Sequence, residues 1–158
     1  MKKSLLVTLT VISCFLLSSC RGDDEVLVPS TWKQVTSPNS QTGVIGMYLL
    51  NEGNMGSNKC TLDYLDYTTG YYRKNIYAET NPSVVMELGD VGNDIQIYGN
   101  KLYAVINCSH FVEVMDKTNA RHLGIINIPN CRYITFHEGF AYVSSYAGPV
   151  QIDPNARL

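Results

Sequence analysis

The sequence predicts an all-β fold, and three observations on this chain of 158 residues favour that class. From residue 44 onward, apolar and polar residues alternate with a period of two, which is the pattern of half-buried strands. Gly, Asn and Asp interrupt the alternation at short intervals, as turns between strands do. No stretch after residue 19 has an apolar stripe with the period of a helix, and residues 83–88 hold at most one helical turn.

The composition indicates a folded domain and argues against one class of function. Hydrophobic residues make up 45% of the chain and charged residues 16%, which is typical of a globular protein. Lys and Arg number 12 against 14 Asp and Glu, giving a formal net charge of −2. Nucleic-acid binders normally carry a basic surface, so this balance argues against that partner.

The first residues have the pattern of a secretory leader. Lys2 and Lys3 precede an apolar run over residues 5–17, which is too short to span a bilayer, since a helix needs about 20 apolar residues for that. Small residues then lead to Cys20, which resembles the lipobox of bacterial lipoproteins. We expect a signal peptide over residues 1–19 and a lipid on the thiol of Cys20. An ordinary signal peptide or an uncleaved anchor is the alternative.

The segment after Cys20 is expected to be a tether. Residues 21–25 are mostly charged and resemble the export signal of surface lipoproteins of Gram-negative bacteria, although a solvated linker would look the same. Residues 26–43 contain Pro, Ser, Thr and Asn without periodicity. We therefore assign residues 20–43 to the lipidated Cys and a flexible tether, and expect the protein at the outer membrane, facing the cell surface.

The expected strands follow in order from residue 44. The first is an apolar run, the second alternates strictly, and the turn Thr68-Thr69-Gly70 leads into the third. A Gly-Asn turn at 99–100 joins the next two, and a run with valines at alternate positions follows them. The expected strands are 44–50, 61–67, 71–77, 94–98, 101–106, 112–116 and 122–128.

An internal repeat selects among the all-β folds. Residues 95–97 align with 134–136, and Tyr103 aligns with Tyr142, both at a spacing of 39. Four strands in about 40 residues are typical of a β-propeller blade, so residues 44–158 are predicted to be a partial β-propeller. A flat solenoid or a sandwich is the alternative. The segment holds about two and a half blades, fewer than the four to eight of a propeller, which favours a fragment of a longer protein over completion by association.

Two groups of motifs resemble a known family. Residues 51–58 with 62–66, and 101–107 with 112–116, resemble the YncE-like surface lipoproteins, whose blades carry a Tyr-Val-Thr-Asn type of repeat. Within that group the chain is most similar to the BtuG-type lipoproteins, seven-bladed propellers that capture cobalamin and pass it to a TonB-dependent outer-membrane transporter. The resemblance implies a binding protein, not an enzyme, with a corrinoid ligand and such a transporter as partner. A propeller that only binds another protein, or an inactive fragment, is the alternative.

Candidate ligand-binding residues lie in loops between the expected strands. Asn51 and Asn54 belong to a polar, Gly-containing loop, and Gly lets a backbone approach a ligand closely. Asn107, His110 and Tyr146 occupy matching positions in consecutive blades, so we expect them on one face. The competing interpretation is that these residues satisfy turn geometry.

The cysteines and histidines give few further sites. Outside the cytoplasm, Cys60, Cys108 and Cys131 allow one disulfide, and Cys108 with Cys131 is the favoured pair because they lie in consecutive repeats; three reduced thiols are the alternative. The spacing of the Cys and His residues matches no metal motif. No catalytic triad, phosphate loop or dinucleotide fingerprint is recognisable, so we assign no catalytic residue, metal or cofactor.

Overall fold

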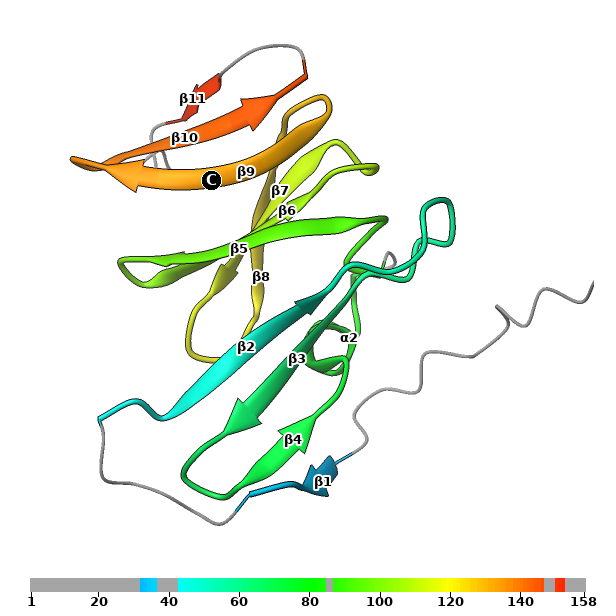
Figure 1. Ribbon diagram of the computed structural model, residues 1–158, viewed down its shortest axis with the longest axis vertical. Coiled ribbons are helices and arrows are strands. Elements are labelled where there is room, and N and C mark those ends of the chain that lie inside the picture. The colour runs from blue at the N-terminus through cyan, green and yellow to red at the C-terminus, as the bar shows by residue number, and fades with distance from the viewer. Residues whose placement is uncertain (1–31, 37–42, 85–86, 147–149, 153–158) are drawn as a thin grey trace, which may run out of the picture.

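The computed structural model describes residues 32–36, 43–84, 87–146 and 150–152. These residues form three antiparallel sheets, with strand orders β1-β4-β3-β2, β5-β6-β7-β8 and β11-β10-β9. The all-β prediction is therefore confirmed. Figure 1 shows the sheets following one another along the long axis of the molecule. The expected signal peptide (1–19) and Cys20 lie outside the described residues.

The first sheet contains β1 (Trp32–Gln34), β2 (Gly46–Asn51), β3 (Thr61–Asp66) and β4 (Tyr71–Arg73). The tether prediction is wrong over residues 32–34, because β1 pairs with β4 at the outer edge of this sheet. The guanidinium of Arg73 lies 4.4 Å from the ring centroid of Trp32, which fixes this strand in place. All three residues of β1 are exposed, so the strand has no apolar alternation for a sequence pattern to reveal.

The segment after β4 is a short helix, α2 (Ile76–Thr80), where the sequence predicted that the strand over 71–77 would continue. The prediction is wrong because Asn75 adopts a left-handed backbone conformation, with φ of 50°, which ends the extended chain. The side chains of Ile76 and Tyr77 are buried beneath the first sheet all the same. The apolar pattern thus identified the buried residues but not the element that carries them.

The second and third sheets repeat one another. The second contains β5 (Gly92–Tyr98), β6 (Lys101–Ile106), β7 (Phe111–Asp116) and β8 (His122–Asn127). The third contains β9 (Cys131–His137), β10 (Phe140–Ser145) and β11 (Val150–Ile152). Gln96 pairs with Tyr103 in the second sheet, and Thr135 pairs with Tyr142 in the third. The spacing of 39 found in the sequence therefore relates two hairpins of the same register.

The turns after β3 and β7 are built alike. Asp66 Oδ1 accepts hydrogen bonds from the backbone N–H and hydroxyl of Thr68, at 2.7 and 2.6 Å. Asp116 Oδ1 accepts the same pair from Thr118, at 2.8 and 2.6 Å. Each turn then ends at a residue with positive φ, Gly70 at 76° and Ala120 at 58°. The side-chain bonds replace backbone bonds that the turn leaves unmade.

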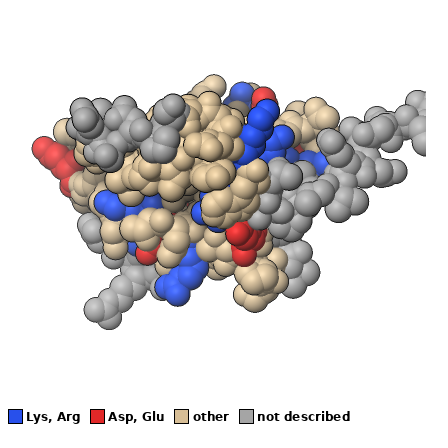
Figure 2. All heavy atoms as spheres, turned by 90° about the horizontal axis from the view of Figure 1, so that it is seen from below, with Lys and Arg blue, Asp and Glu red and all other residues tan. Residues whose placement is uncertain are grey.

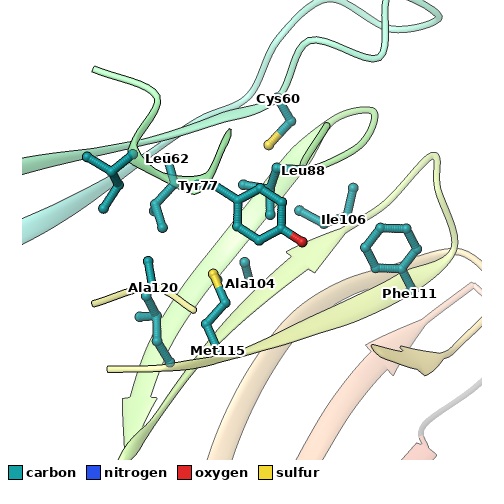
Figure 3. Packing of buried hydrophobic residues seen from close by; sticks show 11 residues of the cluster. Cys60, Leu62, Tyr77, Leu88, Ala104, Ile106, Phe111, Met115 and Ala120 are labelled. Carbon is teal, nitrogen blue, oxygen red and sulfur yellow. The ribbon is translucent and has the colours of Figure 1, made fainter. Parts of the chain in front are cut away.

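Two apolar cores hold the sheets together. Between the first and second sheets, residues such as Leu62, Ile106 and Met115 are buried (Figure 3). Between the second and third, Tyr103, Val112 and Val143 are among the buried residues. Complete burial of a side chain of this size contributes about 1.5–3 kcal/mol to the stability of the fold. Each core therefore holds two neighbouring sheets together. The first strands β2, β5 and β9 also contact one another in sequence.

Within the described residues, no helix is long and apolar enough to cross a bilayer.

Candidate functional site

The loops that carry the predicted site residues meet at one end of the three sheets. This loop end comprises the β2–β3 loop (52–60), the β6–β7 turn (107–110), the segment 128–130 and Tyr146. The backbone N–H of Gly92 donates to the carbonyl of Glu52 at 3.0 Å, which joins the first two sheets there. The N–H of Tyr146 donates to the carbonyl of Asn130 at 3.3 Å, which anchors the segment after β10.

Asp90 organises the β2–β3 loop. Its carboxylate accepts hydrogen bonds from the backbone N–H of Gly56 at 2.8 Å and of Asn58 at 3.4 Å. Its own N–H donates to the hydroxyl of Ser109 in the neighbouring turn, also at 2.8 Å. Asp90 thereby couples two loops that are separated in the sequence. Sequence reasoning missed this residue, because nothing local indicates that a carboxylate at position 90 reaches position 56.

His110 holds the β6–β7 turn against the third sheet. It has a positive φ of 62°, and its carbonyl accepts the N–H of Ile128 at 2.8 Å. Its Nδ1 accepts the backbone N–H of Asn130 at 3.1 Å. Because Nδ1 is the acceptor, the proton of the neutral ring lies on Nε2. The exposed side of this neutral imidazole therefore offers a hydrogen-bond donor.

Two of the predicted ligand residues use their side chains inside the fold. Asn107 is 8% exposed, and its Nδ2 donates to the carbonyl of Cys131 at 2.7 Å. Asn51 Nδ2 donates to Thr61 Oγ1 across the β2–β3 pair at 2.9 Å. The amide of Asn107 ties the second sheet to the third, and that of Asn51 ties two strands of the first sheet. Both residues lie at the loop end, where Asn107 is buried and Asn51 is exposed with one of its two amide N–H groups used in this bond.

The other predicted residues face solvent. Asn54 is exposed at the tip of the β2–β3 loop, and its carbonyl accepts the N–H of Ser57 at 2.9 Å. Tyr146 is 76% exposed, and the guanidinium carbon of Arg132 lies 5.4 Å from the centroid of its ring. The structure therefore brings Asn54, His110 and Tyr146 to the same end as accessible polar groups.

The predicted disulfide between Cys108 and Cys131 is not formed, because all three described cysteines are free. The thiol of Cys131 is turned into the core, where it lies 3.4 Å from the carbonyl of Phe111 and 3.6 Å from that of Ile106. The thiol of Cys108 is directed instead to the side chain of Asn107, at 3.6 Å. Burial raises the pKa of Cys60 to about 12 and also raises that of Cys131, so neither thiol is reactive.

An apolar cleft of about 600 Å³ lies at the opposite end, between the first two sheets. The rings of Tyr48 and Tyr64 stand 4.9 Å apart in its wall, and Tyr48 donates to the carbonyl of Lys117 at 2.9 Å. Burial first, then the nearby Tyr64 and Asp116, raise the pKa of Tyr48 to about 12, which keeps this donor protonated. None of the predicted site residues lines the cleft.

Comparisons with known proteins assign no family to this chain. No family model matches it, and no curated protein is similar enough to count as a relative. Its function is therefore inferred from its own residues and their arrangement.

A buried polar cluster links the first and second sheets. Glu113 is 2% exposed; its Oε1 lies 2.6 Å from Nδ1 of His122 and accepts the hydroxyl of Tyr77 at 3.2 Å. These bonds join β7, β8 and α2, so the cluster helps to hold the first two sheets together. Among the residues that the structure describes, no three Asp, Glu, His or Cys side chains are grouped as a metal site requires.

Proposed function

We propose that this protein is a binding module of the β-propeller type, tethered to the cell surface, that captures a nutrient for a TonB-dependent outer-membrane transporter. The propeller part of the proposal is supported by the way the sheets follow one another. Each sheet packs face to face on the next, and their first strands β2, β5 and β9 lie in contact, as the innermost strands of propeller blades do. The lipobox-like leader adds the anchoring at Cys20, and the resemblance to BtuG-type lipoproteins adds the transporter partner.

The loop end is the proposed binding site, and the observation that carries it is its internal bracing. Asp90 fastens the β2–β3 loop to the β6–β7 turn, and His110 fastens that turn to Asn130. A braced surface loses little conformational entropy when a ligand binds, so its contacts contribute more fully to affinity. The cleft at the opposite end is lined mainly by apolar residues, and its exposed polar residues, Gln96, Lys117 and Thr118, all come from the second sheet and the turn after β7.

A corrinoid is the proposed ligand. It is a flat macrocycle whose rim carries amide groups, and it needs both a surface to lie on and hydrogen-bonding partners around its edge. The ring of Tyr146 offers such a surface, while Asn54 and the Nε2–H of His110 offer hydrogen bonds. In this proposal no residue of the chain binds the cobalt directly.

Calorimetric titration of cyanocobalamin into residues 21–158 tests the ligand. We expect binding that weakens at least tenfold in Asn54→Ala with Tyr146→Ala, since two contacts worth about 1 kcal/mol each are removed. Tyr67→Ala, which changes only the cleft, is the matched control and should bind as the parent chain does. A folded chain that takes up no cyanocobalamin would exclude the corrinoid, and equal loss in the control would move the site to the cleft.

A scaffold that binds another protein is the second candidate. It is favoured by three exposed aromatic residues on one face of the third sheet, namely Tyr133, Phe140 and Tyr142. Exposed aromatic clusters are typical of protein interfaces. If no corrinoid binds and this face is occupied by another protein chain, the scaffold function replaces the capture function.

A further inference from the structure

The apolar cleft between the first two sheets is a cavity that the proposed function does not use. Its volume of about 600 Å³ lies within the range of small-molecule sites, which is about 300–1,000 Å³. One wall comes from β2 and β3 with the residues that flank them, and the other from the β5–β6 hairpin and the turn after β7. These two sheets pack on one another, so the described residues alone form the cleft.

Large apolar side chains are exposed to water in this cleft. The exposed fractions of Ile45, Val44 and Ile97 are 67%, 56% and 55%, and that of Met47 is 41%. Leu102 also lines the cleft and is 1% exposed, because it belongs to the first apolar core. Exposed apolar side chains that gather in a concave site are typical of a ligand-binding site.

The tyrosines of the cleft favour a flexible ligand over a flat one. Tyr48 donates its hydroxyl to the carbonyl of Lys117 at 2.9 Å, and Tyr64 donates to that of Ile45 at 3.5 Å, so both hydroxyl groups are used within the fold. Their rings are tilted by 47° to one another and form no parallel-sided slot for a flat ring system. An aliphatic chain can follow such a wall, since burial of apolar surface requires no fixed orientation.

The cleft carries a positive charge. Among the described residues that line it, Lys117 alone is charged at neutral pH. Its exposed Nζ donates to the carbonyl of Gly99 at 2.7 Å, and an ammonium group has three N–H groups, so it can also donate to a ligand. The neighbouring Asp116 does not line the cleft, and its Oδ1 accepts the two bonds from Thr118. Basic and acidic side chains are interspersed on the face that Figure 2 shows, so a preference for an anion would come from Lys117 itself.

We propose that this cleft binds an aliphatic carboxylate, such as a medium-chain fatty acid. The chain lies along the apolar walls, and the carboxylate accepts a charge-assisted hydrogen bond from the ammonium of Lys117. The site is at the opposite end of the sheets from the loop end, and the inference does not rest on the proposed corrinoid.

Isothermal titration calorimetry of decanoate into residues 21–158, below its micelle concentration, tests the site. We expect saturable binding of one molecule per chain. Affinity should rise about fourfold for each methylene added between octanoate and decanoate, as burial of a methylene predicts. Decanol should bind more weakly than decanoate, and decylamine more weakly still, because Lys117 attracts an anion and repels a cation.

Two variants separate the charge from the apolar walls. Lys117→Met keeps an apolar stem and the backbone carbonyl that Tyr48 contacts, so decanoate should bind about tenfold more weakly while decanol binds as before. Ile97→Thr retains a residue that suits a strand and should weaken both ligands about fivefold. Ile125→Thr is the matched control, because Ile125 is 45% exposed on β8 and does not line the cleft.

Other results overturn the proposal. A folded chain that takes up no decanoate below the micelle concentration excludes the fatty-acid site. Equal affinity for decanoate, decanol and decylamine would show that Lys117 takes no part, and equal loss in Ile125→Thr would place the binding elsewhere. Cyanocobalamin titrated into the same samples should bind Ile97→Thr and Lys117→Met as it binds the parent, which distinguishes failure of this site from failure of the loop end.

Discussion

The carboxylate of Glu113 and the imidazole of His122 form a 2.6 Å pair across the β7–β8 hairpin, at one of the polar junctions between the first and second sheets. Tyr77, from α2 beside the first sheet, donates its hydroxyl to the same carboxylate oxygen. Asn81 completes the junction, because its Nδ2 donates to the carbonyl of Ala120 and its Oδ1 accepts the N–H of His122. A helix that sequence patterns did not predict is thus bonded to the second sheet at several points.

Stability should depend on pH through Glu113. Burial raises the pKa of this carboxyl, and the hydrogen bonds from His122 and Tyr77 only partly oppose that effect. A raised pKa in the folded state means that the contribution to stability is complete below the unfolded value of 4.5 and is lost as the pH rises through the folded value. The difference in unfolding free energy between the parent and Glu113→Gln should therefore grow in favour of the parent as the pH falls from 7.5 to 5. Urea denaturation measures it, with the exposed Glu138→Gln as control; a constant difference would contradict the prediction.

The two Asp-Thr turns should differ in how strongly they respond to exchange of their last residue. Gly70→Ala should destabilise the chain by about 2 kcal/mol or more, because φ is positive and the new Cβ would lie 2.0 Å from the carbonyl oxygen of Thr36. Ala120→Gly should change stability by less than about 1 kcal/mol, since relief of the left-handed backbone offsets the loss of a buried methyl. Urea denaturation measures the change in unfolding free energy of both variants, and similar losses in the two would contradict the prediction.

Removing the Asp90 carboxylate should loosen the loop end. Asp90→Ala leaves the N–H groups of Gly56 and Asn58 without their acceptor, and a loss of about 1 kcal/mol would make local opening about fivefold more frequent. Trypsin cleavage after Lys59, in the same loop, reports that opening. Glu52→Gln is the control, because Glu52 bonds to Gly92 through its backbone carbonyl, which the substitution leaves in place. Unchanged cleavage in Asp90→Ala would mean that the carboxylate does not brace the loop.

The thiols should differ sharply in reactivity. In residues 21–158, Cys60 and Cys131 are buried and Cys108 is partly exposed. We expect one thiol to react quickly with an aromatic disulfide reagent in the native protein and three after unfolding. Cys108→Ser should abolish the fast reaction. A mass two hydrogens lower without reductant would instead demonstrate the disulfide that the structure does not form.

Lipid attachment is tested at Cys20. Expressed with its leader in a Gram-negative host, the full chain should partition into the detergent phase of a Triton X-114 extract, and Cys20→Ser should move it to the aqueous phase. Cys14→Ser is the control within the leader and should partition as the parent does. Equal partition of Cys20→Ser and the parent would contradict the lipoprotein proposal.

Sequence patterns predicted most of the fold because most strands are buried on one face or both. The alternation over β3 and the spacing of 39 between β5–β6 and β9–β10 correspond to observed strands in the observed register. The pattern failed where burial did not follow a strand. β1 is exposed along its length, and Ile76 and Tyr77 are buried on a helix after the left-handed Asn75.

The site was harder to predict than the fold. Turn positions placed Asn54, His110 and Tyr146 at one end, but the sequence cannot distinguish an amide that faces solvent from one that, like Asn107, closes a contact between sheets. Asp90 accepts a hydrogen bond from a residue more than 30 positions earlier in the chain, and no local sequence motif predicts such a contact. Glu113 did carry a signal, since a charged residue inside an otherwise apolar strand needs a buried partner.

The short strand β1 also sets how far the domain can stand from a membrane. With β1 paired to β4, the eleven residues between Cys20 and Trp32 allow a span of at most about 40 Å. If tension on the proposed lipid anchor detached these three residues from β4, the extended segment would run from Cys20 to Gly46 and could span about 90 Å. Detachment of this edge strand would then lengthen the connection to the membrane under force while the cores between the sheets stay intact.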